Sequence, residues 1–275
     1  MTSDLTSRAA FTVARARHRW RTRAAGGAPV VVFSMAKTGS SAVVAGLRAA
    51  GVDDVHHVHD LDPGFLAEEE LEYRWSGRPW RIWDAQQLLR RSPTTAAPWR
   101  VVSIVRDPIG QTVSAFFQPG VRRGYVHADA TVEQLLERFG DRLEHLPLRW
   151  FESHVLPALG IDVYAAPFDV AQRYQVISTP TVELLLLRRE DLAAAPEALA
   201  QLVRAPRPIE IPTVNVAAEK DHADLYASFS RALRPSQDRL DATYASRYVR
   251  HFYSPEEIAR FRAQWTTDAP GRPSL

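Results

Sequence analysis

Hydrophobic and polar positions follow two kinds of pattern along this chain. Short apolar runs at Val30–Phe33, Arg100–Arg106 and Glu183–Leu187 are rich in β-branched and aliphatic residues, which is typical of buried strands. The first run is followed by apolar positions at helical spacing within Ser40–Ala50. Strands that alternate with helices favour a parallel sheet. We therefore expect an α/β fold, with a parallel sheet flanked by helices on both faces and a helical C-terminal part.

The same patterns place the other elements. Further strands are predicted at 53–60, 161–164 and 174–177, and further helices at 84–89, 109–117, 131–140, 145–159, from 188 onwards, and at 217–233, 236–249 and 255–265. Residues 61–99 are predicted to be mainly loop and hold four tryptophans, Trp75, Trp80, Trp83 and Trp99. These aromatic rings either form a platform for a flat ligand or are buried within an irregular segment.

The segment Ser34–Ser41 is small and polar, and it joins the first strand to the first helix. Free backbone N–H groups and the positive end of the helix dipole attract anions at such a place. Of the 34 cationic residues only Lys37 and Lys220 are lysines, so a lysine within this loop is notable. The parallel sheet is expected to be P-loop-like, although the order Lys-Thr-Gly-Ser-Ser differs from the Walker order, in which lysine directly follows the last glycine. A phosphate site is predicted; a plain turn with a surface lysine is the alternative.

Histidines gather in the second predicted strand. Alternation places His57 and His59 on one face and His56 and Asp60 on the other, with His59 and Asp60 at the carboxyl end. Ligands of open α/β sheets bind at that edge. A general base is favoured for this cluster over plain surface histidines. A metal site is least favoured, since alternation leaves no third ligand on one face.

The third strand also ends in a charged residue, Arg106. Asp107 and Pro108 follow it, and Ser114 lies on the helix that begins there. Arg106 and Ser114 are candidates for a second phosphate site. Asp107 as helix cap, with proline at the first helical position, is compatible with that interpretation.

Composition excludes several classes of function. The 275 residues contain no cysteine, which rules out disulfides, thiolate metal sites and cysteine nucleophiles. No apolar run approaches a membrane span, and the start has no apolar signal region, so a cytoplasmic protein is expected. The formal net charge of +2 gives no reason to expect nucleic acid as a partner. Residues 1–27 carry six arginines and one aspartate, and they are predicted to be a basic extension, either solvated or in peripheral contact with a membrane; 28–275 would form one domain.

These motifs together resemble the sulfotransferases that use 3′-phosphoadenosine 5′-phosphosulfate. The likeness rests on the loop Ser34–Ser41, the segment Ile104–Pro108 with Ser114–Phe117, and Leu185–Leu192. The C-terminal half is similar to the sulfotransferase-like bacterial family of capsular polysaccharide synthesis proteins. That second likeness rests on Trp150–Glu152, Gly160–Tyr164, Pro167–Asp169, Asn215 with Lys220 and Tyr226, and His251–Ile258.

The resemblance implies roles for single residues. Lys37 would contact the sulfuryl group, and the 5′-phosphate would be held by Thr38, Gly39, Ser40 and Ser41. The 3′-phosphate would be held by Arg106 and Ser114, His59 would be the base, oriented by Asp60 or another carboxylate, and no metal would be needed. Asn215 and Lys220 would close over the nucleotide or the acceptor. The acceptor would be a hydroxyl of a glycan, a glycolipid or a glycosylated small molecule.

Two other functions stay open from the sequence. A P-loop kinase or NTPase would bind ATP or GTP with Mg²⁺, against which the loop order argues. A non-catalytic nucleotide- or glycan-binding component of polysaccharide assembly would bind the donor without transfer.

Overall fold

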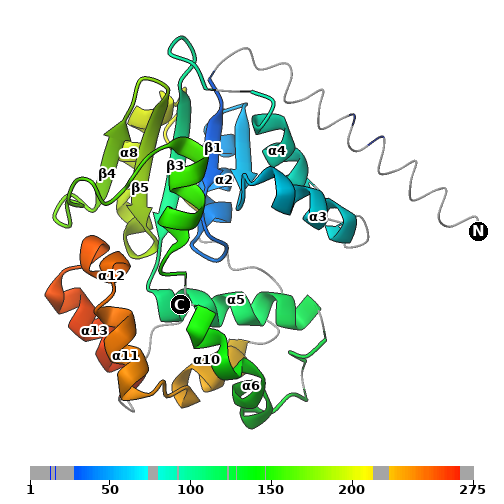
Figure 1. Cartoon of the computed structure of the whole chain (residues 1–275), viewed down its shortest axis with the longest axis vertical. Coiled ribbons are helices and arrows are strands. Elements are labelled where there is room, and N and C mark those ends of the chain that lie inside the picture. The colour runs from blue at the N-terminus through cyan, green and yellow to red at the C-terminus, as the bar shows by residue number, and fades with distance from the viewer. Residues whose placement is uncertain are drawn as a thin grey trace, which may run out of the picture.

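The computed structural model describes residues 28–73, 80–91, 93–122, 124–127, 129–145, 147–212 and 223–266, together with Val13 and Ala16. Its centre is a five-stranded sheet with helices on both faces and a group of C-terminal helices beside one end (Figure 1). The strands lie in the order β2 (Val55–Val58), β1 (Val30–Phe33), β3 (Trp99–Val105), β5 (Val182–Arg188) and β4 (Tyr174–Ser178). All neighbours are parallel except β4, which is antiparallel to β5. The predicted α/β fold is confirmed.

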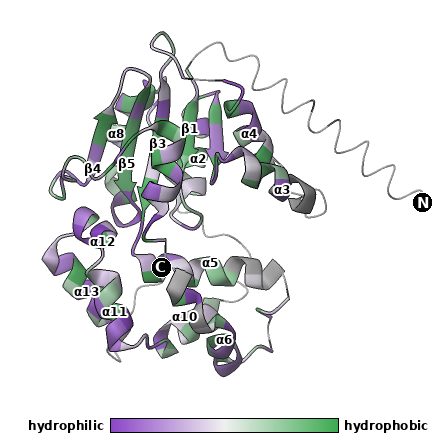
Figure 2. Cartoon of the chain, in the orientation of Figure 1, coloured by the Kyte–Doolittle hydropathy of each residue, from purple (hydrophilic) through white to green (hydrophobic). Residues whose placement is uncertain are grey.

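Alternation within the strands builds two hydrophobic layers. Val30 and Val32 point into the layer shared with α2 (Ser40–Ala49) and α8 (Pro196–Val203). Val31 and Phe33 point into the opposite layer, to which α4 (Trp80–Leu88) and α5 (Pro108–Arg122) contribute. The middle strands are accordingly coloured mainly as hydrophobic in Figure 2. Each such fully buried aliphatic side chain stabilises the fold by roughly 1.5–3 kcal/mol.

The remaining helices complete the described chain. They are α3 (Pro63–Tyr73), α6 (Val132–Phe139), η1 (Gly140–His145), the π-helical turn η2 (Phe151–Val155), α7 (Leu156–Leu159), η3 (Arg189–Ala194), α10 (Ala223–Ala232), α11 (Gln237–Tyr244), α12 (Arg247–Phe252) and α13 (Pro255–Thr266). The helix expected over 236–249 is divided into two. The Ser246 hydroxyl accepts a hydrogen bond from the Val249 N–H and starts a new helix there.

Two predictions about local structure are wrong. The segment 161–164 is a turn: Gly160 ends α7 with a φ of 68°, and the Asp162 carboxylate accepts from the Tyr164 N–H at 2.9 Å. This short polar side chain competes with strand pairing, as aspartates in turns do. Residues 61–99 are also less irregular than expected, because they contain α3 and α4. Trp83 and Trp99 from this segment are buried, whereas Trp75 lies outside the described residues.

The C-terminal helices fix the carboxyl end of β3. The Tyr248 hydroxyl of α12 accepts from the Arg106 N–H at 3.2 Å and donates to the Arg106 carbonyl at 3.1 Å. Tyr248 is fully buried, so these bonds are shielded from water. The carboxyl edge of the parallel strands is therefore supported by the C-terminal helix α12 as well as by the sheet itself.

Candidate functional site

The loop between β1 and α2 has an unusual backbone. Lys37 and Gly39 both adopt positive φ angles, 66° and 91°. A lysine in this region is uncommon, and such strain of about 1–3 kcal/mol is typical of ligand-binding positions. Left-handed residues in a loop before a helix are also part of the backbone nests that bind anions. The conformation fits the predicted anion site.

Internal hydrogen bonds hold this loop in place. The Ser34 hydroxyl lies 2.7 Å from the Thr38 hydroxyl and donates to the Ile104 carbonyl of β3 at 3.0 Å. Thr38 donates to the Met35 carbonyl at 2.9 Å and is fully buried. The Thr38 hydroxyl therefore stabilises the loop, and the phosphate contact predicted for this residue would have to come from its backbone N–H.

The start of α2 adjoins this loop. Gly39 is the N-cap residue, and no side chain caps the helix. The predicted ligands Ser40 and Ser41 are its first two residues, of which Ser40 is buried and Ser41 exposed. Backbone N–H groups of such a first turn have no partner within the helix. An anion is the ligand that this arrangement favours.

Arg106 lies directly against the loop. Its Nη1 donates to the Lys37 carbonyl at 2.8 Å, and Gln111 from α5 donates to the neighbouring Ala36 carbonyl, also at 2.8 Å. Ser114 lies one helical turn after Gln111 and is buried. Residues three apart share a helix face, so Ser114 belongs to the side of α5 that meets the loop. The structure thus places Arg106 against the loop and Ser114 on the face of α5 that carries Gln111.

Asp107 does cap α5, as the sequence suggested. Its carboxylate accepts from the Gly110 N–H at 2.8 Å and from the Tyr244 hydroxyl at 2.9 Å. Burial raises the pKa of Asp107, and these hydrogen bonds to the carboxylate oppose the rise. The group serves to anchor the helix start beside Arg106.

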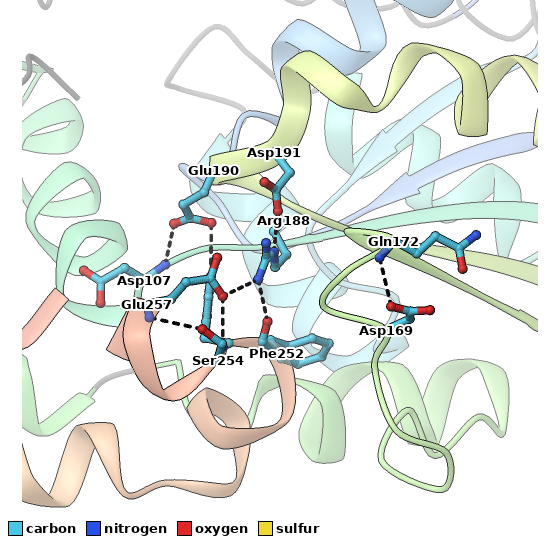
Figure 3. A network of polar contacts seen from close by, with 10 residues as sticks. Asp107, Asp169, Gln172, Arg188, Glu190, Asp191, Phe252, Ser254 and Glu257 are labelled. Atoms are coloured by element: carbon cyan, nitrogen blue, oxygen red, sulfur yellow. Dashed lines mark hydrogen bonds and ion pairs between the residues drawn. The ribbon is translucent and has the colours of Figure 1, made fainter. Parts of the chain in front are cut away.

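A polar network continues from Asp107 to the end of β5 (Figure 3). The Glu190 carboxylate accepts from the Asp107 N–H at 3.0 Å and from the Tyr253 hydroxyl at 3.1 Å. Arg188 is buried and forms ion pairs with Asp191 and with Glu257 of α13. Glu190 therefore joins the end of β3 to the segment after β5, and Arg188 joins the end of β5 to the C-terminal helices through Glu257.

The segment that follows β5 packs on the loop. A β-carbon added to Gly39 would lie 2.6 Å from Leu192 Cδ1 and 2.9 Å from Arg189 Cδ. Only a glycine fits there, both for its φ and for this contact. Arg189 is exposed, so its stem covers the loop and its guanidinium adds a cation to this edge of the sheet.

The three histidines in and just after β2, His56, His57 and His59, have different environments. His56 is fully buried between Asp54 and Asp84, with Nε2 2.9 Å from the first carboxylate and Nδ1 3.3 Å from the second. Burial disfavours its charge, but the two carboxylates outweigh burial and raise its pKa. Asp54 behaves in the opposite way: burial raises its pKa, and the bonds from His56 and Arg91 lower it overall. His56 is therefore part of a buried ion network that ties β2 to α4.

His57 and His59 face the loop instead. His57 Nε2 lies 2.9 Å from the Ser40 hydroxyl, and His59 Nδ1 lies 2.5 Å from the Ser34 carbonyl. Because a carbonyl only accepts, His59 Nδ1 carries a proton, and in the neutral ring Nε2 is the basic nitrogen. The two rings pack edge to face, 4.9 Å apart. The predicted base thus lies within reach of the loop in a suitable tautomer.

Asp60 contacts another histidine. Its carboxylate lies 3.3 Å from His154 Nε2, a residue of the π-helical turn η2, and accepts from the Asp62 N–H at 2.7 Å. The His154 ring stacks on Trp150, and Trp150 meets the ring of Phe33 at the end of β1. Burial raises the pKa of Asp60, and the His154 bond and the Asp62 N–H lower it overall. His59 is oriented by a backbone carbonyl, and Asp60 orients His154.

Sequence reasoning gave no role at this edge to Gln111, His154 or Arg189, and it did not foresee that His57 meets Ser40. Alternation places His57 on the face of His59, but its contact with Ser40 depends on strand pairing. Gln111 and Arg189 reach the loop, and His154 reaches Asp60, through contacts between distant segments. Their positions leave no local signal in the sequence.

Some predicted features fall outside the described residues. These are Asn215, Lys220 and, apart from Val13 and Ala16, the basic segment 1–27. Within the described ranges, no group of three or more metal-ligating side chains is placed to hold a metal ion. The helices of those ranges also include none with the length and apolar character of a membrane span.

Comparison with known proteins gives one match. Residues 125–254, a little under half of the chain, match the model of the family described as "Putative capsular polysaccharide synthesis protein". No curated protein and no solved structure matches the chain. The matched segment includes Trp150, His154 and the tyrosines Tyr244, Tyr248 and Tyr253, which support the site. Both β2 and the loop Ser34–Ser41 precede it. We call this loop the anion loop, after the anion site predicted for it.

Proposed function

We propose that this protein is an enzyme, a sulfotransferase. It would move a sulfuryl group from 3′-phosphoadenosine 5′-phosphosulfate to a hydroxyl of a glycan, a glycolipid or a glycosylated small molecule. The observation that carries the proposal is the grouping around one loop. Lys37 and the uncapped start of α2 lie between Arg106 on one side and His59 on the other. The family match, which concerns polysaccharide synthesis, supports an acceptor of the glycan class.

The residue types suit the chemistry. The acceptor oxygen forms a bond to sulfur while the bond from sulfur to the bridging phosphate oxygen breaks. His59 Nε2 takes the proton of the hydroxyl, and Lys37 with the start of α2 stabilises the charge that grows on the leaving phosphate. Positioning and electrostatic stabilisation do most of the work in such an in-line displacement. The donor has two separated anionic groups, which fits two cationic positions, Lys37 and Arg106, better than a linear triphosphate does.

Thermal unfolding with nucleotides tests donor recognition. A ligand at ~100 times its dissociation constant adds about 2.7 kcal/mol of stability. We expect 3′-phosphoadenosine 5′-phosphate, the product nucleotide, to raise the midpoint by roughly 5–10 °C, at about 2–4 °C per kcal/mol. A shift with ATP and Mg²⁺ but none with the bisphosphate nucleotide would refute the proposal in favour of an NTPase.

Transfer itself is tested with radiolabelled donor and a panel of p-nitrophenyl glycosides as acceptors. Lys37→Ala should lower turnover by about 10²–10³, the usual effect of one preorganised donor to a developing anion. His59→Ala should abolish transfer and leave the nucleotide shift nearly intact. The exposed Arg250 of α12 provides a control, Arg250→Ala, which should behave as wild type. Donor binding without transfer to any acceptor would instead favour a non-catalytic component of polysaccharide assembly.

A further inference from the structure

The contact between His57 and Ser40 joins the base-bearing strand to the anion loop. Ser40 is the first residue of α2 and is 3% exposed, and His57 in β2 is 7% exposed. Ser40 Oγ and His57 Nε2 lie 2.9 Å apart. Both side chains are shielded from water, so water does not compete for this hydrogen bond. The roles predicted for His59 as the base and for Ser40 as a phosphate ligand do not explain why His57 contacts Ser40.

His57 is held from two other sides. Its backbone N–H donates to the Asp84 carboxylate of α4 at 3.3 Å, and its ring packs edge-on against His59. The strand register fixes its height, since His57 lies opposite Val32 in β1. Asp84 and His59 are titratable groups that lie against it. The imidazole is thus a rigid support rather than a mobile side chain.

The protonation of His57 Nε2 decides whether the Ser40 hydroxyl can donate a hydrogen bond to a ligand. A serine hydroxyl has one hydrogen and two lone pairs. If His57 Nε2 carries a proton, it donates to the Ser40 oxygen, and the serine hydrogen stays available for another acceptor. If Nε2 is the bare nitrogen, the serine must donate to it and has no hydrogen left. Only the first arrangement lets Ser40 donate to an anion in the loop.

We propose that His57 is a positioning residue for the phosphate next to the transferred group. It keeps Nε2 protonated, accepts no hydrogen bond from Ser40, and so turns the Ser40 hydroxyl into a donor to the 5′-phosphate. This inference rests on the proposed function, because it names how that donor is held. The ligand class is a phosphate monoester or phosphosulfate anion at the start of α2.

The test is calorimetric titration of 3′-phosphoadenosine 5′-phosphate into the full chain and its variants. Ser40→Ala should weaken binding about tenfold or more, the scale of a hydrogen bond to a charged group. His57→Leu should weaken it to a similar extent. His57→Gln places an amide N–H near the position of Nε2 and should restore affinity to within about threefold. His57→Asn is shorter, cannot reach Ser40, and should not.

The double variant Ser40→Ala/His57→Leu separates positioning from general structural damage. If His57 acts through the serine, His57→Leu has no further effect once Ser40 is alanine. Circular dichroism and melting temperature confirm that each variant is folded, and His57→Asn replaces His57→Leu if the latter is not. Wild-type affinity in His57→Leu, or an equal loss in the Ser40→Ala background, would overturn the inference alone. Failure of the wild type to bind this nucleotide would overturn the proposed function as well.

Discussion

Arg188 offers a sharp test of how the site is supported. It ends β5, is 2% exposed, and its Nη1 donates to Glu257 at 2.8 Å and to the Phe252 carbonyl at 3.0 Å (Figure 3). Its Nε pairs with Asp191 in η3, the segment that covers the anion loop. One guanidinium therefore connects the sheet edge with α12 and α13. We consider Arg188→Met, which keeps an unbranched apolar side chain similar to the arginine stem and removes the guanidinium with its charge and donors.

The loss of stability in Arg188→Met depends on the two carboxylates that would lose their partner. Removing one partner of a buried ion pair costs about 3–5 kcal/mol, because the remaining charge stays buried and unpaired. Asp191 and Glu257 keep 14% and 19% exposure, so water partly solvates both carboxylates. We therefore expect the lower end, a loss of about 3 kcal/mol in the free energy of unfolding. At roughly 2–4 °C per kcal/mol the melting temperature should fall by about 6–12 °C.

The assay is thermal and urea unfolding of the full chain at neutral pH. Arg250→Met on α12 is the matched control, since this arginine is exposed, and it should change stability by no more than about 0.5 kcal/mol. The triple variant Arg188→Met/Asp191→Asn/Glu257→Gln removes the unpaired charges and should recover more than half of the loss. A fall of less than about 2 °C in Arg188→Met, or no recovery in the triple variant, would refute the reasoning.

Two further predictions concern the loop and the buried ion network. Gly39→Ala should destabilise the fold by about 1–3 kcal/mol and abolish the nucleotide-induced shift, because Gly39 has a positive φ and an added β-carbon would lie 2.6 Å from Leu192. Gly160→Ala is the control for the backbone effect alone, since Gly160 has a positive φ and an added β-carbon would have no neighbour within 4 Å. Equal melting temperatures for the two variants would contradict the steric argument. The pKa of His56 is raised above its ordinary 6.5, so its stabilisation is complete below pH 6.5 and is lost as pH rises through the folded-state pKa. The pKa of Asp54 is lowered below 3.8, so its contribution is present above that pH and is lost as pH falls through the folded-state pKa. The melting temperature should therefore be highest between these limits and fall as the pH rises through the folded-state pKa of His56, and His56→Gln should reduce that alkaline fall; an unchanged fall would show that another group causes it.

The family match and the structure bear on different parts of the chain. The matched segment 125–254 supplies most of the C-terminal helices, η2 and the β4–β5 pair. The anion loop, β2 and β3 come from the preceding residues. The donor recognition that we propose would therefore belong mainly to the N-terminal half. Tyr244, Tyr248 and Glu257, which hold the ends of β3 and β5, belong to the C-terminal half. The two tyrosines lie within the matched segment, and Glu257 follows it.

Local pattern was sufficient for most elements and insufficient for some. The strands β1 and β3 were predictable because both faces of each are buried, which requires nearly continuous apolar residues. The cap at Asp107 was predictable because it depends on the next few residues only. The turn at 161–164 was not, since its apolar residues are buried without strand pairing, and a buried apolar residue looks the same in either case.

By itself, the sequence determined the strand–loop–helix at Ser34–Ser41 and the placement of charged residues at strand ends, because both follow from side-chain periodicity and from the conformational demands of glycine. Only the tertiary structure decided which of those residues meet. The pairing of β1 with β2 sets His57 against Ser40 and His59 against Ser34, and chain closure over 69 residues brings Glu257 to Arg188. Such contacts depend on strand register and on the packing of distant segments, where a shift of one residue exchanges the two faces of a strand. No window of sequence contains that information.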